Sequence, residues 1–227
     1  MRLKNRTLPA YSRGEETANM ITHIAGAALA FTGLILCVIS AAWNKNIPGI
    51  ISGTIYGLSM IVVYVVSSVY HGLDEKSAFI GKRVMQVIDH CDIYGLIVGT
   101  FSPIVLCGLI KTHPVTAYVS YSIVWVTAII GTVFTAIDFH KFRGISYSMY
   151  FISGWSVLIT IKAMYDTFGM QFIILLVAGG AVYSLGMIFY ALETKKHKYC
   201  HSVFHLFIIA GSVIQFIAVF RFCFLNR

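Results

Sequence analysis

Residues 46–73 read NIPGIISGTIYGLSMIVVYVVSSVYHGL and contain no Asp, Glu, Lys or Arg. Six other uncharged runs of similar kind lie at 17–44, 93–110, 112–137, 144–161, 167–192 and 199–220. Each run is long enough to cross a hydrocarbon layer of ~30 Å as an α-helix, which rises about 1.5 Å per residue. The pattern predicts an all-α integral membrane protein, a bundle of seven transmembrane helices spanning approximately 20–43, 48–71, 88–110, 115–137, 144–164, 171–192 and 200–221.

The overall composition supports the same fold class. Of the 227 residues, 58% are hydrophobic and 11% are charged, which leaves too little polar surface for a soluble domain of this size. After seven spans only short loops remain, so we expect one membrane domain over residues 1–227. The five cysteines show no CxxC spacing and are expected to be small core residues.

The basic residues are distributed unevenly over the predicted loops, and this asymmetry predicts the orientation. Five of the 17 Lys and Arg residues fall on the side opposite the N-terminus. The remaining twelve fall on the N-terminal side: Arg2, Lys4, Arg6, Arg13, Lys76, Lys82, Arg83, Lys141, Arg143, Lys195, Lys196 and Lys198. The positive-inside rule then places the N-terminus in the cytoplasm and the C-terminus outside. We therefore expect a multi-pass protein of the plasma membrane. Its net charge of +8 reflects topology and does not indicate nucleic-acid binding.

Polar residues gather at the predicted cytoplasmic ends of the helices. In the first run, Glu16, Asn19 and His23 are spaced i, i+3 and i+7 and so share one helical face. One interpretation is an N-terminal turn whose acidic residues complement the helix dipole. That interpretation explains Glu16 but not His23, which lies more than a turn deeper.

The second and third runs carry further candidates at the same predicted face. Ser67 lies one turn before His71 on the same helical face. A single His at a helix C-terminus is more often a partner of the helix dipole than a metal ligand, and a single Ser is more often a small packing residue. The third run is preceded by Asp89, His90 and Asp92. An Asp in the first turn of a helix complements the dipole, but two with a His between exceed that role, and only one can face inward. We take Asp89, His90 and Asp92 as possible site residues.

The seventh run begins with His201-x-x-x-His205, which places two imidazoles on one helical face, the geometry for two ligands of one metal. With His71 the pair offers three ligands and leaves a fourth position open, the arrangement of a catalytic zinc. The hypothesis requires the second and seventh helices to be neighbours. Intramembrane ionisable groups are costly enough to indicate a functional site by default.

The ordered set of motifs resembles the hemolysin III branch of the progestin and adipoQ receptor family. The resemblance rests on Glu16-x-x-Asn19-x-x-Thr22-His23, Ser67-x-x-x-His71, Asp89-His90, Ile93-Tyr94, Gly99-Thr100-Phe101-Ser102-Pro103, His201-x-x-x-His205-Leu206-Phe207 and Ala210-Gly211-Ser212. It spans nearly the whole chain. The chain departs from the family pattern at Gln215, Phe204 and Asp92, where His, Trp and a neutral residue are common.

The resemblance implies seven transmembrane helices with the N-terminus inside and a zinc bound by His71, His201 and His205. It also matches Asp89 and Ser67 to the family's Asp and Ser, and extends more loosely to alkaline ceramidases. We therefore expect metal-assisted hydrolysis of a membrane lipid amide or ester, with Asp89 as the proton carrier and Ser67 at the oxyanion or the water.

The alternative is a non-enzymatic protein in which zinc only ties helix ends together. Such a protein would act in membrane homeostasis, as a receptor, or as a pore that causes cytolysis. A pore needs a continuous polar stripe along a span, which no predicted helix has, so we rank it last. The sequence leaves the lipid and the oligomeric state open.

Overall fold

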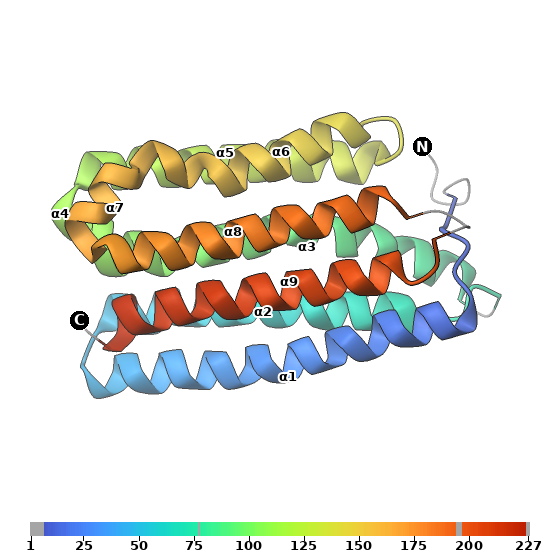
Figure 1. Cartoon of the computed structure of the whole chain (residues 1–227), viewed down its shortest axis with the longest axis horizontal. Helices are drawn as coiled ribbons and strands as arrows, with labels where there is room; N and C mark the ends of the chain where they lie inside the picture. The colour runs from blue at the N-terminus through green and yellow to red at the C-terminus, as the bar shows by residue number, and fades with distance from the viewer. Residues whose placement is uncertain (1–6, 77, 194–196, 226–227) are drawn as a thin grey trace.

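The computed structural model describes residues 7–76, 78–193 and 197–225. Within these residues seven helical spans are long and apolar enough to cross a membrane, as predicted, and no strand is present (Figure 1). Three spans contain breaks and are assembled from more than one helical element. In chain order the elements are α1 (Arg13–Trp43), α2 (Ile47–Gly72), α3 (Phe79–Ile104) with η2 (Val105–Leu109) and α4 (Ile110–Thr112), α5 (Pro114–Asp138), α6 (Arg143–Trp155) with η3 (Ser156–Thr160) and α7 (Ile161–Phe168), α8 (Met170–Ala191), and α9 (Cys200–Val219) with η4 (Phe220–Leu225).

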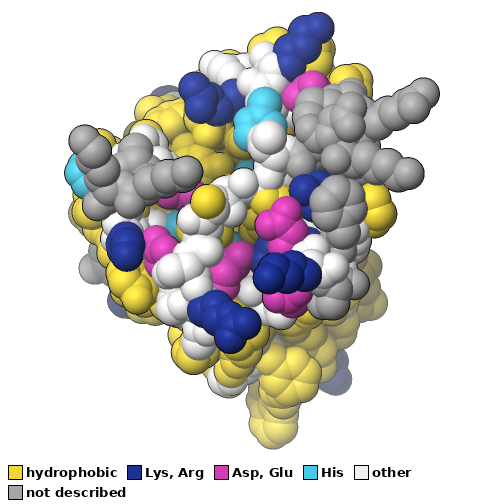
Figure 2. Space-filling view, turned by 90° about the vertical axis from the view of Figure 1, so that its right-hand side faces the viewer, with side chains coloured by type: hydrophobic (Ala, Val, Ile, Leu, Met, Phe, Trp, Pro, Cys, Tyr) yellow, Lys and Arg dark blue, Asp and Glu magenta, His cyan; other side chains and the backbone are white. Residues whose placement is uncertain are grey.

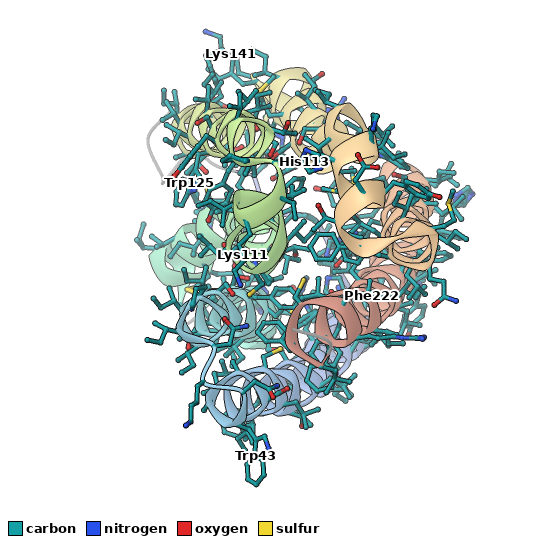
Figure 3. The ribbon with its side chains drawn as sticks, turned by 90° about the vertical axis from the view of Figure 1, so that its left-hand side faces the viewer. Trp43, Lys111, His113, Trp125, Lys141 and Phe222 are labelled. Carbon is teal, nitrogen blue, oxygen red and sulfur yellow. The ribbon has the colours of Figure 1, made fainter. Side chains whose placement is uncertain are left out.

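The helices run roughly parallel to one long axis, and the two ends of the chain lie at opposite ends of the bundle (Figure 1). Helix α1 packs along both α2 and α9, α8 packs along α9, and α5 packs along α3 and α6. We call the end at which α1, α3 and α9 begin the N-terminal end. Charged side chains gather on this end, among them Asp, Glu and His (Figure 2). Trp43, Lys111 and His113 mark the opposite end (Figure 3).

Helix α1 begins at Arg13, whereas the sequence predicted a span from residue 20. The early start has a local cause, because Ser12 and Glu15 form a capping box. The Ser12 hydroxyl accepts from the Glu15 backbone N–H at 3.3 Å, and the Glu15 carboxylate accepts from the Ser12 backbone N–H at 2.9 Å. These bonds satisfy N–H groups that have no partner within the helix. Glu16 therefore lies inside α1, in its first turn.

Helix α3 begins at Phe79, whereas the predicted third span began at residue 88. The extra turns carry Lys82 and Arg83, which are only 5% and 6% exposed. They are tolerated there because each is paired, Lys82 with Glu16 at 2.6 Å and Arg83 with Glu75 at 3.1 Å. Asp89 thus lies well inside α3, and the expectation that it occupies the first turn is wrong. A dipole role no longer accounts for it.

Of the three spans that contain breaks, the third and the fifth are interrupted farthest from their ends. After Pro103, which lacks a backbone N–H, α3 continues as the π-helical turn η2. The fifth span changes to a 3₁₀ turn between α6 and α7 and extends to Phe168, beyond the predicted end at 164. Gly169 then joins α7 to α8 with a φ of 83°, a conformation that favours glycine. The other span boundaries differ from the predicted ones by a few residues at most.

A stripe of small residues along α1 lets both α2 and α9 pack closely against α1. A side chain at Gly26 would meet the Tyr64 ring of α2 at 2.8 Å, and one at Gly33 would meet the Phe216 ring of α9 at 3.0 Å. Because the stripe leaves this space, side chains of α2 and α9 meet over α1, as when Tyr64 donates to the Ser212 hydroxyl at 2.6 Å. This three-helix packing positions the site described next.

Candidate metal centre

Three histidines meet at the N-terminal end of the bundle. His71 lies in the last turn of α2, and His201 and His205 lie one turn apart at the start of α9. Each offers a ring nitrogen within 4.8 Å of those of the other two. The rings are buried, with exposed fractions of 3%, 7% and 2% for His71, His201 and His205. The structure thus brings together the three residues that sequence spacing nominated, and together they can hold a metal ion.

Each of the three imidazoles is held through its Nδ1 atom. His71 Nδ1 donates to Glu16 Oε2 at 2.6 Å, and His201 Nδ1 donates to Glu193 Oε2 at 2.8 Å. His205 Nδ1 lies 3.2 Å from the backbone carbonyl oxygen of Asn19. A carboxylate or carbonyl on one ring nitrogen fixes the tautomer, so that the other nitrogen carries the lone pair.

The Nε2 atoms, on the other side of the imidazole rings, show which way the histidines face. His71 Nε2 and His201 Nε2 are fully buried and have no hydrogen-bond partner within the described part of the chain. Leaving a buried polar atom unpaired costs about 1–3 kcal/mol. A metal ion shared by these nitrogens would remove that cost. The three buried imidazoles, each held by a contact at Nδ1, therefore form a ligand set that fits a divalent transition metal.

The two carboxylates behind the histidines are themselves held. Glu16 also accepts from Lys82 Nζ at 2.6 Å, and Glu193 also accepts from the Tyr11 hydroxyl at 2.5 Å. Burial acts to raise the pKa of Glu193, but the hydrogen bonds from His201 and Tyr11 together with the charges of His201 and His71 outweigh it, and the pKa lies below its usual value. Burial, reinforced by the neighbouring Glu193 carboxylate, raises the pKa of Tyr11. Tyr11 is therefore a neutral donor and Glu193 a charged acceptor at neutral pH.

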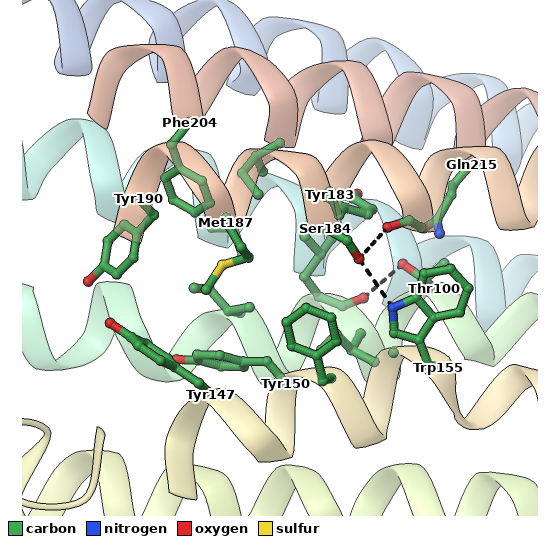
Figure 4. Close-up of a pocket in the computed structure, with 18 of the residues that line it drawn as sticks. Thr100, Tyr147, Tyr150, Trp155, Tyr183, Ser184, Met187, Tyr190, Phe204 and Gln215 are labelled. Atoms are coloured by element: carbon green, nitrogen blue, oxygen red, sulfur yellow. Dashed lines mark hydrogen bonds between the residues drawn. The ribbon is translucent and has the colours of Figure 1, made fainter. Parts of the chain in front are cut away.

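A cavity opens beside the histidines and extends along the bundle between α3, α6, α8 and α9. It contains about 1420 Å³ of empty space, counting its open side. His201, His205, Ser67 and Asp89 line it at the N-terminal end. Farther in, the lining is mostly apolar and aromatic, with isolated polar groups such as the Trp155 indole, which donates to the Ser184 hydroxyl at 3.2 Å (Figure 4). The histidine cluster therefore lies at the end of a largely apolar chamber.

The structure distinguishes the two acids of α3. Asp89 lines the cavity together with His201 and His205, and its side chain is 13% exposed. Asp92 does not line the cavity, and its two carboxylate oxygens are buried with no partner among the described residues. Asp89 is thus the acid that a substrate in the cavity would meet.

The remaining candidates have separate roles. Ser67 lines the cavity, and its hydroxyl is buried without a hydrogen-bond partner in the described residues. His90 is not one of the three clustered histidines, because its Nδ1 donates to the Gln86 carbonyl at 2.7 Å and its Nε2 lies 3.2 Å from the Tyr190 hydroxyl. Asn19 supports the cluster by accepting from the Ser202 hydroxyl at 2.5 Å.

Sequence reasoning missed Tyr11, Thr22, Lys82 and Glu193 as parts of the site. Thr22 lies 3.2 Å from His205 Nδ1 and was seen only as part of a motif. Tyr11 and Glu193 lie in the segments that precede α1 and α9, outside the uncharged runs that predict the spans. The signal that could have found Glu193 is its acidic side chain eight residues before His201, in an otherwise basic loop.

Comparison with known proteins gives a consistent result. A family model described as "Haemolysin-III related" matches residues 11–216. The Hemolysin-3 homolog of Bacillus subtilis (strain 168) is 36% identical over 209 residues, which cover 92% of this chain and 94% of that protein. Hemolysin-3 of Bacillus cereus is 34% identical over 205 residues, covering 90% of each chain. The human Monocyte to macrophage differentiation factor is 25% identical over 231 residues, covering 97% of this chain and 92% of that protein.

Proposed function

The chain belongs to the haemolysin-III related family of multi-pass membrane proteins, and from that premise we propose that it is a zinc-dependent hydrolase of a membrane lipid amide or ester. The observation that carries the proposal is the buried trio of His71, His201 and His205 at the head of a largely apolar cavity. We place the protein in the plasma membrane, with the histidine site at the cytoplasmic end.

Zinc is the metal that the ligand set favours. Imidazole nitrogens suit zinc, and three protein ligands with an open position are typical of catalytic zinc sites. The Glu16–His71 and Glu193–His201 pairs match the carboxylate–histidine arrangement that supports zinc ligands. Bound zinc would supply Lewis-acid activation of a water molecule and of the scissile carbonyl.

A lipid substrate follows from what the cavity would accept. Its walls are largely apolar, so an acyl chain would be buried favourably there, at about 25 cal/mol per Å² of apolar surface removed from water. Its polar end carries the ionisable groups. A molecule with an acyl chain and a polar carbonyl linkage would therefore place the linkage beside Asp89 and the histidines.

The proposed chemistry uses two residues of this chain on the cavity wall. Asp89 takes a proton from the attacking water and returns it to the leaving nitrogen or oxygen, the role of a general acid–base residue. Ser67 donates its hydroxyl, which has no partner among the described residues, to the developing oxyanion. Glu16 and Glu193 keep His71 and His201 in one tautomer and orientation throughout.

The test is elemental analysis and turnover of the same purified sample. We expect about one zinc per chain and release of free fatty acid from at least one member of a panel of ceramides, acyl-amino lipids and phospholipids in nanodiscs. Chelation should abolish release, and zinc should restore it. A protein that holds zinc but releases nothing from the panel would favour the non-enzymatic alternative, in which the metal ties the helix ends together in a receptor-like, homeostatic or cytolytic protein.

A further inference from the structure

Tyr11 covers the metal centre from outside the helical bundle. It lies in the segment that precedes α1, yet its ring centroid is 5.7 Å from that of His71 and 5.3 Å from that of His201. Its ring is tilted by 55° to the first and 45° to the second. The aromatic ring therefore spans two of the three candidate ligands on the side facing the N-terminal end.

The Tyr11 hydroxyl also reaches the support of one ligand. It donates to Glu193 Oε1 at 2.5 Å, while the other oxygen of the same carboxylate accepts from His201 Nδ1 at 2.8 Å. Glu193 is thus held from both sides. A carboxylate that rotates freely would hold the imidazole less well, so Tyr11 acts on His201 through Glu193.

The first turn of α1, directly after the segment that carries Tyr11, is fastened to the loop that leads into α9. Glu15 Oε1 accepts from the Tyr199 backbone N–H at 3.1 Å. Tyr199 has a φ of 60°, a left-handed conformation that is unfavourable for a non-glycine residue and persists only where its surroundings hold it. Gly14 leaves the space for this contact, because a Cβ there would lie 2.8 Å from the Tyr199 hydroxyl oxygen.

We propose that residues 11–15 form a strap that closes the N-terminal side of the metal centre, with Tyr11 as a positioning residue that fixes Glu193 on His201. The metal would then be reached only from the cavity. The proposal rests on the proposed function in that it assumes a bound metal. A tyrosine that merely packs against the histidines is the competing explanation, and the two differ in the part played by the hydroxyl.

Zinc affinity and zinc release, measured on the full-length protein with a colorimetric chelator, separate these explanations. Tyr11→Phe keeps the ring and loses the hydroxyl, so we expect its zinc affinity to fall and its zinc release to quicken, each about three- to tenfold, whereas mere packing of the ring would leave both unchanged. Tyr11→Ala removes the cover as well, and zinc should then be lost at least about tenfold faster. Tyr165→Phe, at an exposed tyrosine of the opposite end, is the matched control and should behave as wild type.

A double-mutant cycle identifies the partner. Glu193→Gln should weaken zinc binding by about 10- to 100-fold, the usual effect of losing an outer-shell partner. Tyr11→Phe should then add little in the Glu193→Gln background, because the two act as one unit. Additive effects, or wild-type affinity in Tyr11→Phe together with wild-type release in Tyr11→Ala, would overturn the strap. A wild-type protein that binds no zinc would instead overturn the metal centre itself.

Discussion

The imidazole of His23 lies flat on that of His205, with ring centroids 3.6 Å apart and 15° between the planes. Both nitrogens of His23 are buried and have no hydrogen-bond partner in the described residues. The ring also lines the cavity. A buried imidazole whose nitrogens have no hydrogen-bond partner is available to bind a ligand. Stacking on His205 holds the His23 ring in place when no ligand is bound.

His23→Phe should therefore keep the stack and the metal while losing one hydrogen bond to the substrate. We expect unchanged zinc content and a KM for the lipid raised about three- to tenfold, since a hydrogen bond is worth about 0.5–1.5 kcal/mol. Steady-state kinetics with any lipid that the wild type cleaves would measure this. Loss of zinc from His23→Phe would instead make His23 a support of the metal site.

The double variant His201→Ala with His205→Ala should hold no zinc, because one remaining imidazole cannot retain the ion in competition with buffer. Elemental analysis checks this directly. The unfolding temperature should fall to that of chelated wild type, since a ligand that binds only the folded state stabilises it. Full zinc occupancy in the double variant would exclude both residues as ligands.

Asp89→Asn tests the acid–base role without touching a candidate ligand. Asparagine keeps the size and hydrogen-bonding capacity of the side chain but cannot accept the proton. The variant should retain its zinc and its fold while turnover falls about 10²- to 10⁴-fold, the range supplied by general acid–base catalysis. Should Asp89→Asn lose its metal and unfold, the acid would be structural.

Gly154→Leu tests the cavity. A Cβ at Gly154 meets nothing within 4 Å, and the residue lines the cavity, so the new side chain should enter it without disturbing α6. Zinc content should stay constant while activity on long-chain lipids falls more than on short-chain analogues. Gly144→Leu, on the same helix and equally unhindered but outside the cavity lining, is the control. Equal loss in both variants would mean that the cavity does not hold the substrate.

Topology is checked by reporters fused after Arg227. The twelve-to-five distribution of basic residues predicts that this terminus lies outside the cytoplasm. Alkaline phosphatase should then be active there, and a fluorescent protein that matures only in the cytoplasm should be dark. The reverse result would place the histidine site on the outer face.

The fold was predictable because the signal for each span is local. An uncharged run of sufficient length has few alternatives to a membrane helix, and the seven predicted spans are confirmed. The starts of α1 and α3 were not predictable in this way. Both contain charged residues that count against a span in sequence, and Lys82 is neutralised by Glu16, a residue of another helix.

The site was predictable to the extent that its chemistry follows helical spacing. His201 and His205 are one turn apart, so their proximity needs only a helix. Glu193 and Tyr11 acquire their roles from tertiary contacts between the segments that precede α9 and α1. Nothing in the local sequence specifies that a tyrosine before the first span will touch a carboxylate before the last.

The polar face at the start of α1 holds histidines that belong to two other helices. Glu16 bonds His71 of α2, whereas Asn19 and Thr22 each place an oxygen 3.2 Å from His205 Nδ1 on α9. This face of α1 therefore gains all of its partners only when both α2 and α9 have packed against it. The three candidate ligands, His71, His201 and His205, likewise come together only in the assembled bundle, so that a site built from them would also report that α1, α2 and α9 have packed.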